Sequence, residues 1–368
     1  MKFVINRNTM LPALSFVSSV VERRQTLPIL SNVFFNIEDG RLVLVGSDLE
    51  VEVTRTIDGV ECENGSFTVL ARTVTDIVRM LPDDAQVSFS YENRELSIES
   101  GKSRYKLKTL PAEDYPRIQT EEWEERFKVE GKILKAMLEK TSFAMAQQDV
   151  RYYLNGVSLS MGGNELMATA TDGHRLARTK VPLDVDLENE REIILPRKAV
   201  FEISKIFDGN EDSTLTLEYS RNHMRVTGPD TVLITKLIDG KFPQFDEVVS
   251  IDGDATGLSL DRRSLIEMLS RVSVLTTDRF KGIRMILGEN RLKVTANTPE
   301  QEQAVEEMEV EYDGPEILCG YNVIYLLDAA KTIETEKADV LLDDKGHICY
   351  FRQPGDEHSL WLVMPMRI

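Results

Sequence analysis

Hydrophobic and polar positions follow the same order of patterns three times along the chain. Stretches in which apolar and polar residues alternate around a leucine occur at 40–48 (GRLVLVGSD), 164–172 (NELMATATD) and 290–298 (NRLKVTANT). A period of two residues is typical of a β-strand, and a turn residue precedes each stretch. The pattern therefore predicts three equivalent strands, about 125 residues apart.

Two helical patterns accompany each of these strands. Apolar residues with helical spacing open the repeats at 6–22, 131–146 and 261–275. A short apolar strand that runs into an amphipathic helix follows at 67–81, 192–207 and 315–333, and hairpin-like strand pairs occupy 86–100, 214–228 and 338–352. Two helices in each repeat are too few to cover both faces of a parallel sheet. We therefore predict an α+β fold, in which each repeat has two helices and antiparallel sheets.

The linkers between repeats are recognisable from their composition. Residues 120–127 are acidic and lack periodicity, and residues 246–257 are rich in Asp and Gly. The predicted domains are 1–122, 128–246 and 247–368. A repeat of this length is compatible with ordinary domain duplication that has no functional meaning, but three copies in phase favour a ring or an arc.

Composition and charge narrow the class of protein. A chain of 368 residues exceeds the size of one hydrophobic core, and 42% hydrophobic with 29% charged residues is typical of a globular protein. No stretch is apolar enough for a membrane span, and we expect no signal peptide. Cys62, Cys319 and Cys349 lack metal-ligand spacing, which favours a reducing, cytoplasmic location.

The net charge of −18 argues against a nucleic-acid partner, because such affinity comes from basic residues that neutralise phosphates. However, each of the six helical windows is neutral or basic. If the two helices of each repeat face the same way, they form one basic surface on an acidic body, which attracts a polyanion locally. The alternative is that Lys and Arg occur there only because they favour helices. No motif for base-specific recognition accompanies them.

The stretch ATDGHRLAR (170–178) has the strongest apparent chemistry, since it places Asp172, His174 and Arg175 around a glycine. Asp172-Gly173 after an alternating strand predicts a hairpin turn, so His174 and Arg175 should point to opposite faces of the next strand. No nucleophile motif is present, and the other histidines lack metal-ligand spacing. We expect no catalytic residue, no metal and no cofactor. The alternative, an enzyme that uses Asp172 and His174, stays open at this point, as does an acidic scaffold that binds no DNA.

The C-terminal sequence SLWLVMPMRI (359–368) is unusually apolar for a chain end. Its first half is typical of a core strand, whereas Pro365 cannot donate to a strand ladder and marks the exit from the sheet. The methionines beside this proline suit an adaptable apolar surface for several partners.

Several ordered motifs resemble one family over the whole chain. They are TLPIL (26–30), SDLEVE (47–52), QDVRYYLNG (148–156), TDGHRLA (171–177), LPRK (195–198), DGKFP (239–243), TPEQE (298–302) and MPMR (364–367). With these motifs the sequence resembles the bacterial DNA polymerase III β subunit, the sliding clamp. The resemblance implies a non-enzymatic processivity factor that forms a head-to-tail homodimeric ring around double-stranded DNA, with its helices lining the hole.

The resemblance also implies roles for particular residues. Those that contact DNA in the family correspond to Arg24, Arg72, Gln148, Tyr152, Tyr153, Arg197 and Lys198, although strand packing is an alternative role for the two tyrosines. The dimer interface corresponds to Tyr105 and Leu107 against Val274 and Leu275, with charged residues around TPEQE beside it.

A peptide pocket between the second and third domains is the remaining site that the resemblance implies. Its residues correspond to Leu154, Thr171, Gly173, His174, Arg175, Leu176, Pro243, Val248, Asn322, Tyr325, Leu362, Val363, Met364, Pro365, Met366 and Arg367. The implied partners are the alpha subunit of the replicative DNA polymerase, the clamp loader, translesion polymerases and mismatch-repair proteins, with no membrane partner. Glu247 and Ile368 depart from frequent residues of the family, so the pocket rim is expected to rank peptides differently. Gln25 replaces a proline that is frequent beside the loop arginine, which affects only the expected stiffness of that loop.

Overall fold

The computed structural model describes residues 1–22, 26–120, 122–183, 190–206, 213–251, 255–277, 280–298, 300–342 and 348–367. These residues form two compact units. One unit contains residues 1–135 and 198–237, and the other contains residues 136–197 and 238–368. The middle repeat contributes to both units.

A single antiparallel sheet runs through the first unit. Its strands, in spatial order, are β1 (Lys2–Asn6), β6 (Gln86–Glu92), β7 (Glu95–Ser100), β8 (Ser103–Leu110), β5 (Gly65–Leu70), β2 (Asn32–Glu38), β3 (Arg41–Ser47), β4 (Val51–Asp58), β16 (Thr231–Lys236), β15 (His223–Thr227), β14 (Thr214–Tyr219) and β9 (Glu125–Glu130). Alternate residues of these strands are buried, as Val33, Phe35 and Ile37 show in β2. This alternation follows from the strand period of two.

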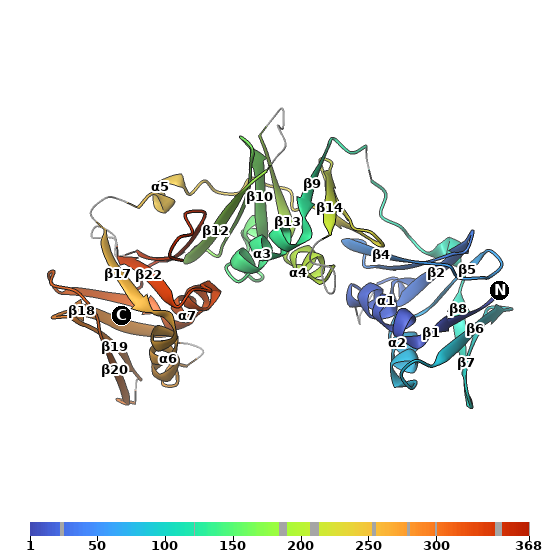
Figure 1. Cartoon of the computed structure of the whole chain (residues 1–368), viewed down its shortest axis with the longest axis horizontal. Helices are drawn as coiled ribbons and strands as arrows, with labels where there is room; N and C mark the ends of the chain where they lie inside the picture. Colours follow the sequence, from blue (N-terminus) through green and yellow to red (C-terminus); the bar gives the residue numbers. More distant parts are fainter. Residues whose placement is uncertain are drawn as a thin grey trace. The chain divides into compact units, whose positions relative to one another are not determined.

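Helices cover one face of this sheet. The helices of the unit are α1 (Arg7–Ser19), α2 (Ala71–Met80) and most of α4 (Arg197–Lys205), with short 3₁₀ turns at Pro28–Ser31 and Ala112–Asp114. The Asn6 side chain accepts the N–H of Asn8 and so caps α1. Helices α1 and α2 pack side by side, and the Ser18 and Thr75 hydroxyls lie 2.9 Å apart between them (Figure 1).

The second unit contains two antiparallel sheets. The larger has the order β13 (Arg191–Pro196), β10 (Gly156–Gly162), β11 (Glu165–Thr171), β12 (Arg175–Pro182), β24 (Ser359–Val363), β23 (Cys349–Arg352), β22 (Lys337–Leu342) and β17 (Thr256–Asp261). The smaller has the order β20 (Gln303–Glu309), β19 (Arg291–Asn297), β18 (Gly282–Gly288) and β21 (Ile317–Asn322). Trp361 of β24 is fully buried and donates its indole N–H to the carbonyl of Lys140 at 2.9 Å.

The helices of the second unit are the greater part of α3 (Gly131–Ser142), α5 (Asp246–Val249), α6 (Arg262–Ser273) and α7 (Val323–Thr332), with a 3₁₀ turn at Tyr152–Leu154. Asp261 caps α6 by accepting the N–H of Ser264, and α6 packs beside α7 (Figure 1). In the first and third repeats the two helices thus lie side by side, as one basic surface formed by both helices of a repeat requires. The predicted strands at 40–48, 164–172 and 290–298 are confirmed as β3, β11 and β19, and so is the α+β class.

Two strand pairings join neighbouring repeats, and we call them the internal seams. The last strand of the second repeat, β16, pairs with β4 of the first repeat within the first unit. The last strand of the third repeat, β24, pairs with β12 of the second repeat within the second unit. The corresponding strands β8 and β20 have no such partner among the described residues, where β20 pairs with β19 and residues 103–107 of β8 pair with β7 alone.

Candidate functional site

The stretch 170–178 forms the turn between β11 and β12 that the sequence predicts. Gly173 has a φ of +89°, a backbone conformation that favours glycine, and the Arg151 guanidinium lies close to the position that a Cβ would occupy. One carboxylate oxygen of Asp172 accepts the N–H groups of His174 at 2.9 Å and Arg175 at 3.1 Å. Asp172 therefore serves as a turn residue, and its carboxylate is already occupied.

Arg175 points away from His174 and into the unit. Its guanidinium donates to Asp172 at 3.0 Å and to Asp328 of α7 at 2.6 Å, and its Cζ lies 4.3 Å from the centre of the Tyr325 ring. Only 12% of the Arg175 side chain is exposed, whereas His174 is exposed. The acid, imidazole and guanidinium thus do not converge on a reaction centre.

The C-terminal strand lies directly beside this turn. In the pairing of β12 with β24, Arg175 is opposite Val363 and Leu176 is opposite Leu362. Beyond the strand, the N–H of Met364 donates to the carbonyl of His174 at 2.8 Å. The two stretches that the sequence singled out, separated by some 180 positions in the chain, are therefore neighbours.

An apolar cluster lies between these strands and α5. Its buried members are Leu176, Tyr350 and Leu362, and half-buried residues pack against them: Phe245, Val248, Val249, Ile251, Leu341, Ile348, Leu360 and Met364. The Tyr350 hydroxyl donates to the carbonyl of Val248 at 3.0 Å and fixes α5 over the cluster. Phe245 also packs against a second cluster that contains the buried residues Leu154 and Phe242, so the two clusters are continuous through Phe245.

The remaining predicted pocket residues lie around these clusters in the same unit. Leu154 is buried rather than exposed, and Pro243 is half-buried. The Asn322 side chain accepts the N–H of Ile324 and caps α7. Met366 is 42% exposed, and its N–H donates to the carbonyl of Gly320. Thr171, Pro365 and Arg367 complete the set, with Thr171 donating its hydroxyl to the Arg175 carbonyl.

The residues predicted to contact DNA are divided between the two units. Arg72 of α2 is 74% exposed, and Gln148 is exposed with a φ of +55°. Tyr152 is 57% exposed and Tyr153 is half-buried, and both lie in a 3₁₀ turn rather than in a strand. Tyr153 packs against the cluster that contains Leu154 and Phe242, so the alternative of a packing role holds for this residue, though not from a strand. Arg197 begins α4. Arg24 lies outside the described residues.

Lys198 differs from the other predicted DNA contacts because its ammonium group already has protein acceptors. It donates to the Val20 carbonyl at 2.9 Å, to Glu22 at 3.0 Å and to Asp48. All three N–H bonds of the ammonium thus point at oxygens of the first repeat.

The residues predicted for a dimer interface lie at open strand edges or beside them. Tyr105 and Leu107 are half-buried on β8. Val274, which follows α6, is 79% exposed, and Leu275 is half-buried. A valine that is so exposed at a helix end is a candidate for burial in an assembly.

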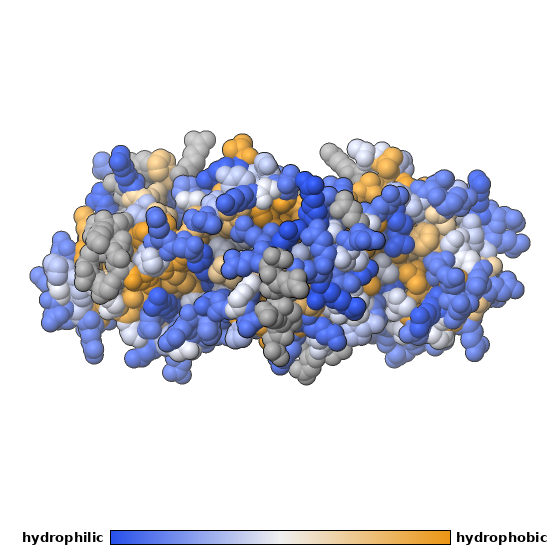
Figure 2. Space-filling model, turned by 90° about the horizontal axis from the view of Figure 1, so that it is seen from above, coloured by the Kyte–Doolittle hydropathy of each residue, from blue (hydrophilic) through white to orange (hydrophobic). Residues whose placement is uncertain are grey.

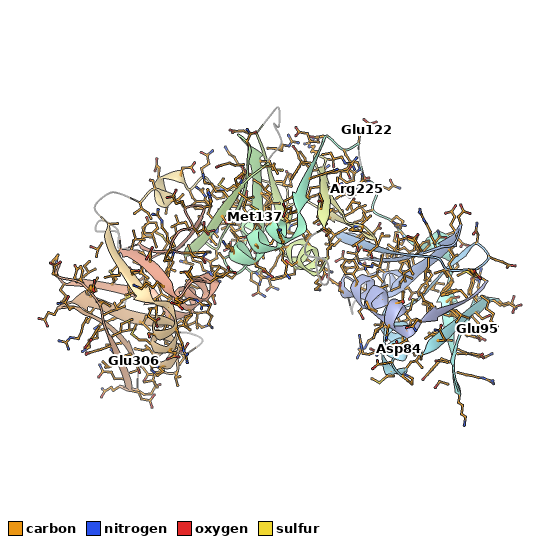
Figure 3. All side chains as sticks on the ribbon, viewed as in Figure 1. Asp84, Glu95, Glu122, Met137, Arg225 and Glu306 are labelled. Carbon is orange, nitrogen blue, oxygen red and sulfur yellow. The ribbon has the colours of Figure 1, made fainter. Side chains whose placement is uncertain are left out.

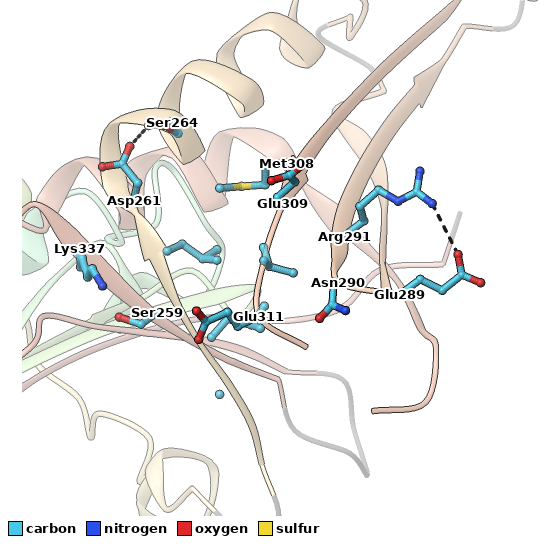
Figure 4. Close-up of a pocket in the computed structure, with 14 residues that line it drawn as sticks. Ser259, Asp261, Ser264, Glu289, Asn290, Arg291, Met308, Glu309, Glu311 and Lys337 are labelled. Carbon is cyan, nitrogen blue, oxygen red and sulfur yellow. Dashed lines mark hydrogen bonds and ion pairs between the residues drawn. The ribbon is translucent and has the colours of Figure 1, made fainter. Parts of the chain in front are cut away.

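Sequence reasoning did not find the large cavity that Figure 4 shows. It has a volume of about 1060 Å³ and lies between β17, the start of α6, the turn before β19 and the end of β20. Apolar residues such as Leu258, Leu260 and Val310 line it together with the charged residues Asp261, Glu309, Glu311 and Lys337. Both flanking strands, β17 and β20, are sheet edges, a property that no local sequence pattern announces.

Hydrogen bonds from Arg151 lower the pKa of Asp149 to about 2, and burial raises the pKa of the Cys349 thiol. Within the described ranges no group of His, Cys, Asp and Glu side chains is arranged to hold a metal ion. Nor does any helix in those ranges have the length and apolar character needed to cross a membrane.

Three repeats of this topology define a three-domain DNA clamp fold, and comparisons with known proteins agree. Models of the N-terminal, central and C-terminal domains of the DNA polymerase III beta subunit match residues 1–119, 128–244 and 252–367. The chain is 39% identical to the beta sliding clamp of Pseudomonas putida, with both chains fully covered. It therefore belongs to the DNA polymerase III beta subunit family, the beta sliding clamps, which are processivity factors rather than enzymes.

Solved structures give the same result. The DNA polymerase III subunit beta of Pseudomonas aeruginosa superposes with a TM-score of 0.94 at 39% identity, with both chains fully covered. A sliding clamp from the same organism bound to griselimycin has a TM-score of 0.95 at 39% identity, again with full coverage. The domain bounds at 122, 128 and 246 remain predictions.

Proposed function

We propose that the protein forms a head-to-tail homodimeric ring that encircles duplex DNA, slides without sequence specificity and confers processivity on the replicative polymerase. The observation that carries this proposal is the pair of internal seams. The same strand pairing occurs twice within the chain, β16 with β4 and β24 with β12. The third pairing of this kind, β8 with β20, needs a second copy, and two copies in head-to-tail order close the ring.

The internal seams also give a register for the proposed seam. Leu233 of β16 lies opposite Val53 of β4. Tyr105 corresponds to Leu233, because they pair with Ile98 and Val226 at the same position of the repeated hairpins 86–100 and 214–228. We therefore place Tyr105 of one copy opposite the residue of β20 that corresponds to Val53.

That residue is Ala304. Val53 pairs with Gly46 in the β3–β4 hairpin, and Ala304 pairs with Ala296 in the β19–β20 hairpin. Gly46 and Ala296 hold the same position in the repeated strands 40–48 and 290–298. The small Ala304 leaves room for the Tyr105 ring on the face that carries the helices.

Charge supports the same pairing of edges. The exposed face of β8 carries Arg104, Lys106 and Lys108, and the β20 strand carries Glu306, Glu307 and Glu309. Within the monomer Lys106 pairs with Glu95 at 2.9 Å and Arg271 pairs with Glu306 at 2.7 Å; Figure 3 labels both glutamates. Opposite charges on two open edges favour their association and disfavour the pairing of either edge with itself.

We propose that DNA is held by phosphate contacts from Arg24, Arg72 and Arg197, assisted by Gln148 and by the Tyr152 and Tyr153 pair. Tyr152 and Tyr153 meet edge to face with ring centres 5.8 Å apart, and Tyr152 is the more exposed of the two. Contacts of this kind carry no sequence information, and the acidic remainder of the chain repels DNA elsewhere.

The half-buried apolar residues that pack around Leu176 and Leu362, among them Phe245, Val248 and Met364, form the proposed docking site for linear peptides. Its partners are the polymerase alpha subunit, the clamp loader, translesion polymerases and mismatch-repair proteins, all met in the cytoplasm. Polar residues cover most of the face in Figure 2, with apolar residues between them. A short peptide with a few apolar anchors matches a small group of half-buried apolar residues.

Retention on circular DNA tests the proposal. The protein is loaded onto nicked circular DNA with a clamp loader and ATP, and the DNA is then linearised. A topological ring stays on the circle at moderate salt and leaves the linear form. Equal retention on both would refute the ring, and a hydrolytic activity lost on His174→Ala would favour the enzyme alternative instead.

A further inference from the structure

The ammonium group of Lys198 joins the second repeat to the first within one compact unit. Lys198 stands in the first turn of α4, and its acceptors are the Val20 carbonyl, Glu22 and Asp48. Val20 is the C-terminal cap of α1, and Asp48 follows β3. One side chain therefore connects the end of a helix, the segment after it and a strand turn.

Asp48 is built to receive this ammonium. Its side chain is 5% exposed, and one carboxylate oxygen accepts the N–H groups of Glu50 at 2.8 Å and Val51 at 2.7 Å. The second oxygen accepts from Lys198. A carboxylate with so little exposure requires a charged partner, because an unpaired buried charge is costly.

The charge of Lys198 is secured by the same contacts. Burial lowers the pKa of Lys198, but hydrogen bonds from its ammonium to Asp48 and Glu22 outweigh burial and leave the pKa raised. The group is thus cationic at every pH near neutrality. A DNA phosphate could take the ammonium only by displacing an acceptor that is already bonded.

The position of these acceptors gives the bond a consequence for DNA binding. Val20 and Glu22 come directly before Arg23 and Arg24 in the sequence, and Arg24 is a proposed phosphate contact. Fixing the residues before an arginine reduces the conformational entropy that is lost when the arginine binds.

We infer that Lys198 is a positioning residue, which aids DNA binding by holding segment 20–22 through Glu22 and Asp48 and does not itself contact phosphate. This inference rests on the proposed function and alters the role of one of its residues. The changes in DNA affinity that it predicts are opposite in sign to those expected from net charge alone. Removing Asp48 or Glu22 makes the protein less acidic, yet DNA binding is expected to weaken.

The test measures the affinity of the full-length protein for duplex DNA by fluorescence anisotropy at several salt concentrations. The variants are Lys198→Ala, Asp48→Asn and the double variant. If Lys198 positions the segment, each single change weakens binding by about tenfold, and the double variant is no weaker than either. The slope of log Kd against log salt stays unchanged, because no phosphate contact is lost.

Direct contact with phosphate predicts different numbers. Lys198→Ala would then reduce the salt slope by about 1, while Asp48→Asn would tighten binding or leave it unchanged. That pair of results would overturn the inference. Lys205→Ala is the matched control for a lost lysine on α4, since Lys205 is 45% exposed and pairs with Glu202 of its own helix. Asp58→Asn is the control for a lost exposed carboxylate.

A milder variant serves as a control for loss of folding. Glu22 is 57% exposed, so Glu22→Gln removes one acceptor without leaving a buried charge unpaired. Weaker binding by Glu22→Gln supports the inference even if Asp48→Asn is poorly folded, and tighter binding contradicts it. If the unaltered protein does not bind duplex DNA, the proposed function fails. If the unaltered protein binds DNA but the variants do not weaken binding as expected, only the positioning role of Lys198 fails.

Discussion

Truncating one exposed valine is expected to weaken the dimer strongly without affecting the fold. Val274 is 79% exposed in the monomer, so nearly all of its side chain is available for burial at the proposed seam. Val274→Ala removes two methyl groups, which is worth about 1.6 kcal/mol at ~0.8 kcal/mol for each buried carbon. A closed ring of two copies has two seams, so the dimer loses about 3 kcal/mol, which corresponds to a roughly hundredfold larger dissociation constant.

Sedimentation velocity over a concentration series measures this dissociation constant, and circular dichroism checks that the fold is retained. Val4→Ala is the matched control, because Val4 of β1 is 56% exposed and has no part in the proposed seam. The control is expected to change the constant by less than about twofold. A Val274→Ala dimer as tight as the unaltered one, or an equal loss in the control, would refute the placement of the seam.

The remaining predictions concern the register, the peptide site and one titration. Tyr105→Cys with Ala304→Cys, in a Cys62→Ser background, should form an intermolecular disulfide detected on non-reducing gels, whereas Tyr105→Cys with Val305→Cys should not, because Val305 points to the opposite face. His174→Ala should weaken the binding of a polymerase-derived peptide, measured by calorimetry, while the dimer persists; undiminished peptide affinity would exclude His174 from the site. The Asp149 carboxyl should titrate near pH 2 by NMR, and its pairing with Arg151 stabilises the fold above the ordinary pKa of 3.8 and is lost as the pH falls towards 2. Arg151→Gln should move that midpoint up towards 3.8, and an unmoved midpoint would assign the low pKa to another cause.

The elements that follow from local patterns could be predicted closely. Alternation around Leu42, Leu166 and Leu292 identified β3, β11 and β19, because a strand with one buried face must repeat every two residues. The Asp172-Gly173 turn followed from the positive φ that glycine permits. The 3₁₀ turn at Tyr152–Leu154 was not foreseen, since three residues are too short to show a period.

The candidate site was predictable only in part. Successive residues of a strand point to opposite faces, so the separation of His174 from Arg175 could be predicted. The partners of Arg175 could not be predicted, because Asp328 lies on a helix far along the chain. Likewise the sequence alone suggests that the lysine at the start of α4 is a cation without a protein partner. Its three acceptors come from a different repeat, and only packing brings them within bonding distance.

The sequence by itself determined the threefold repeat, the α+β class and the family, because local periodicity and ordered motifs are written along the chain. Tertiary structure alone decided which edges are joined and which stay open. Strand edges carry identical backbone donors and acceptors, so their pairing depends on which surfaces packing brings together. For that reason β16 and β24 find partners within the chain, whereas among the described residues β20 has a neighbour only on the β19 side and residues 103–107 of β8 have one only on the β7 side; these are the edges that the proposed seam joins.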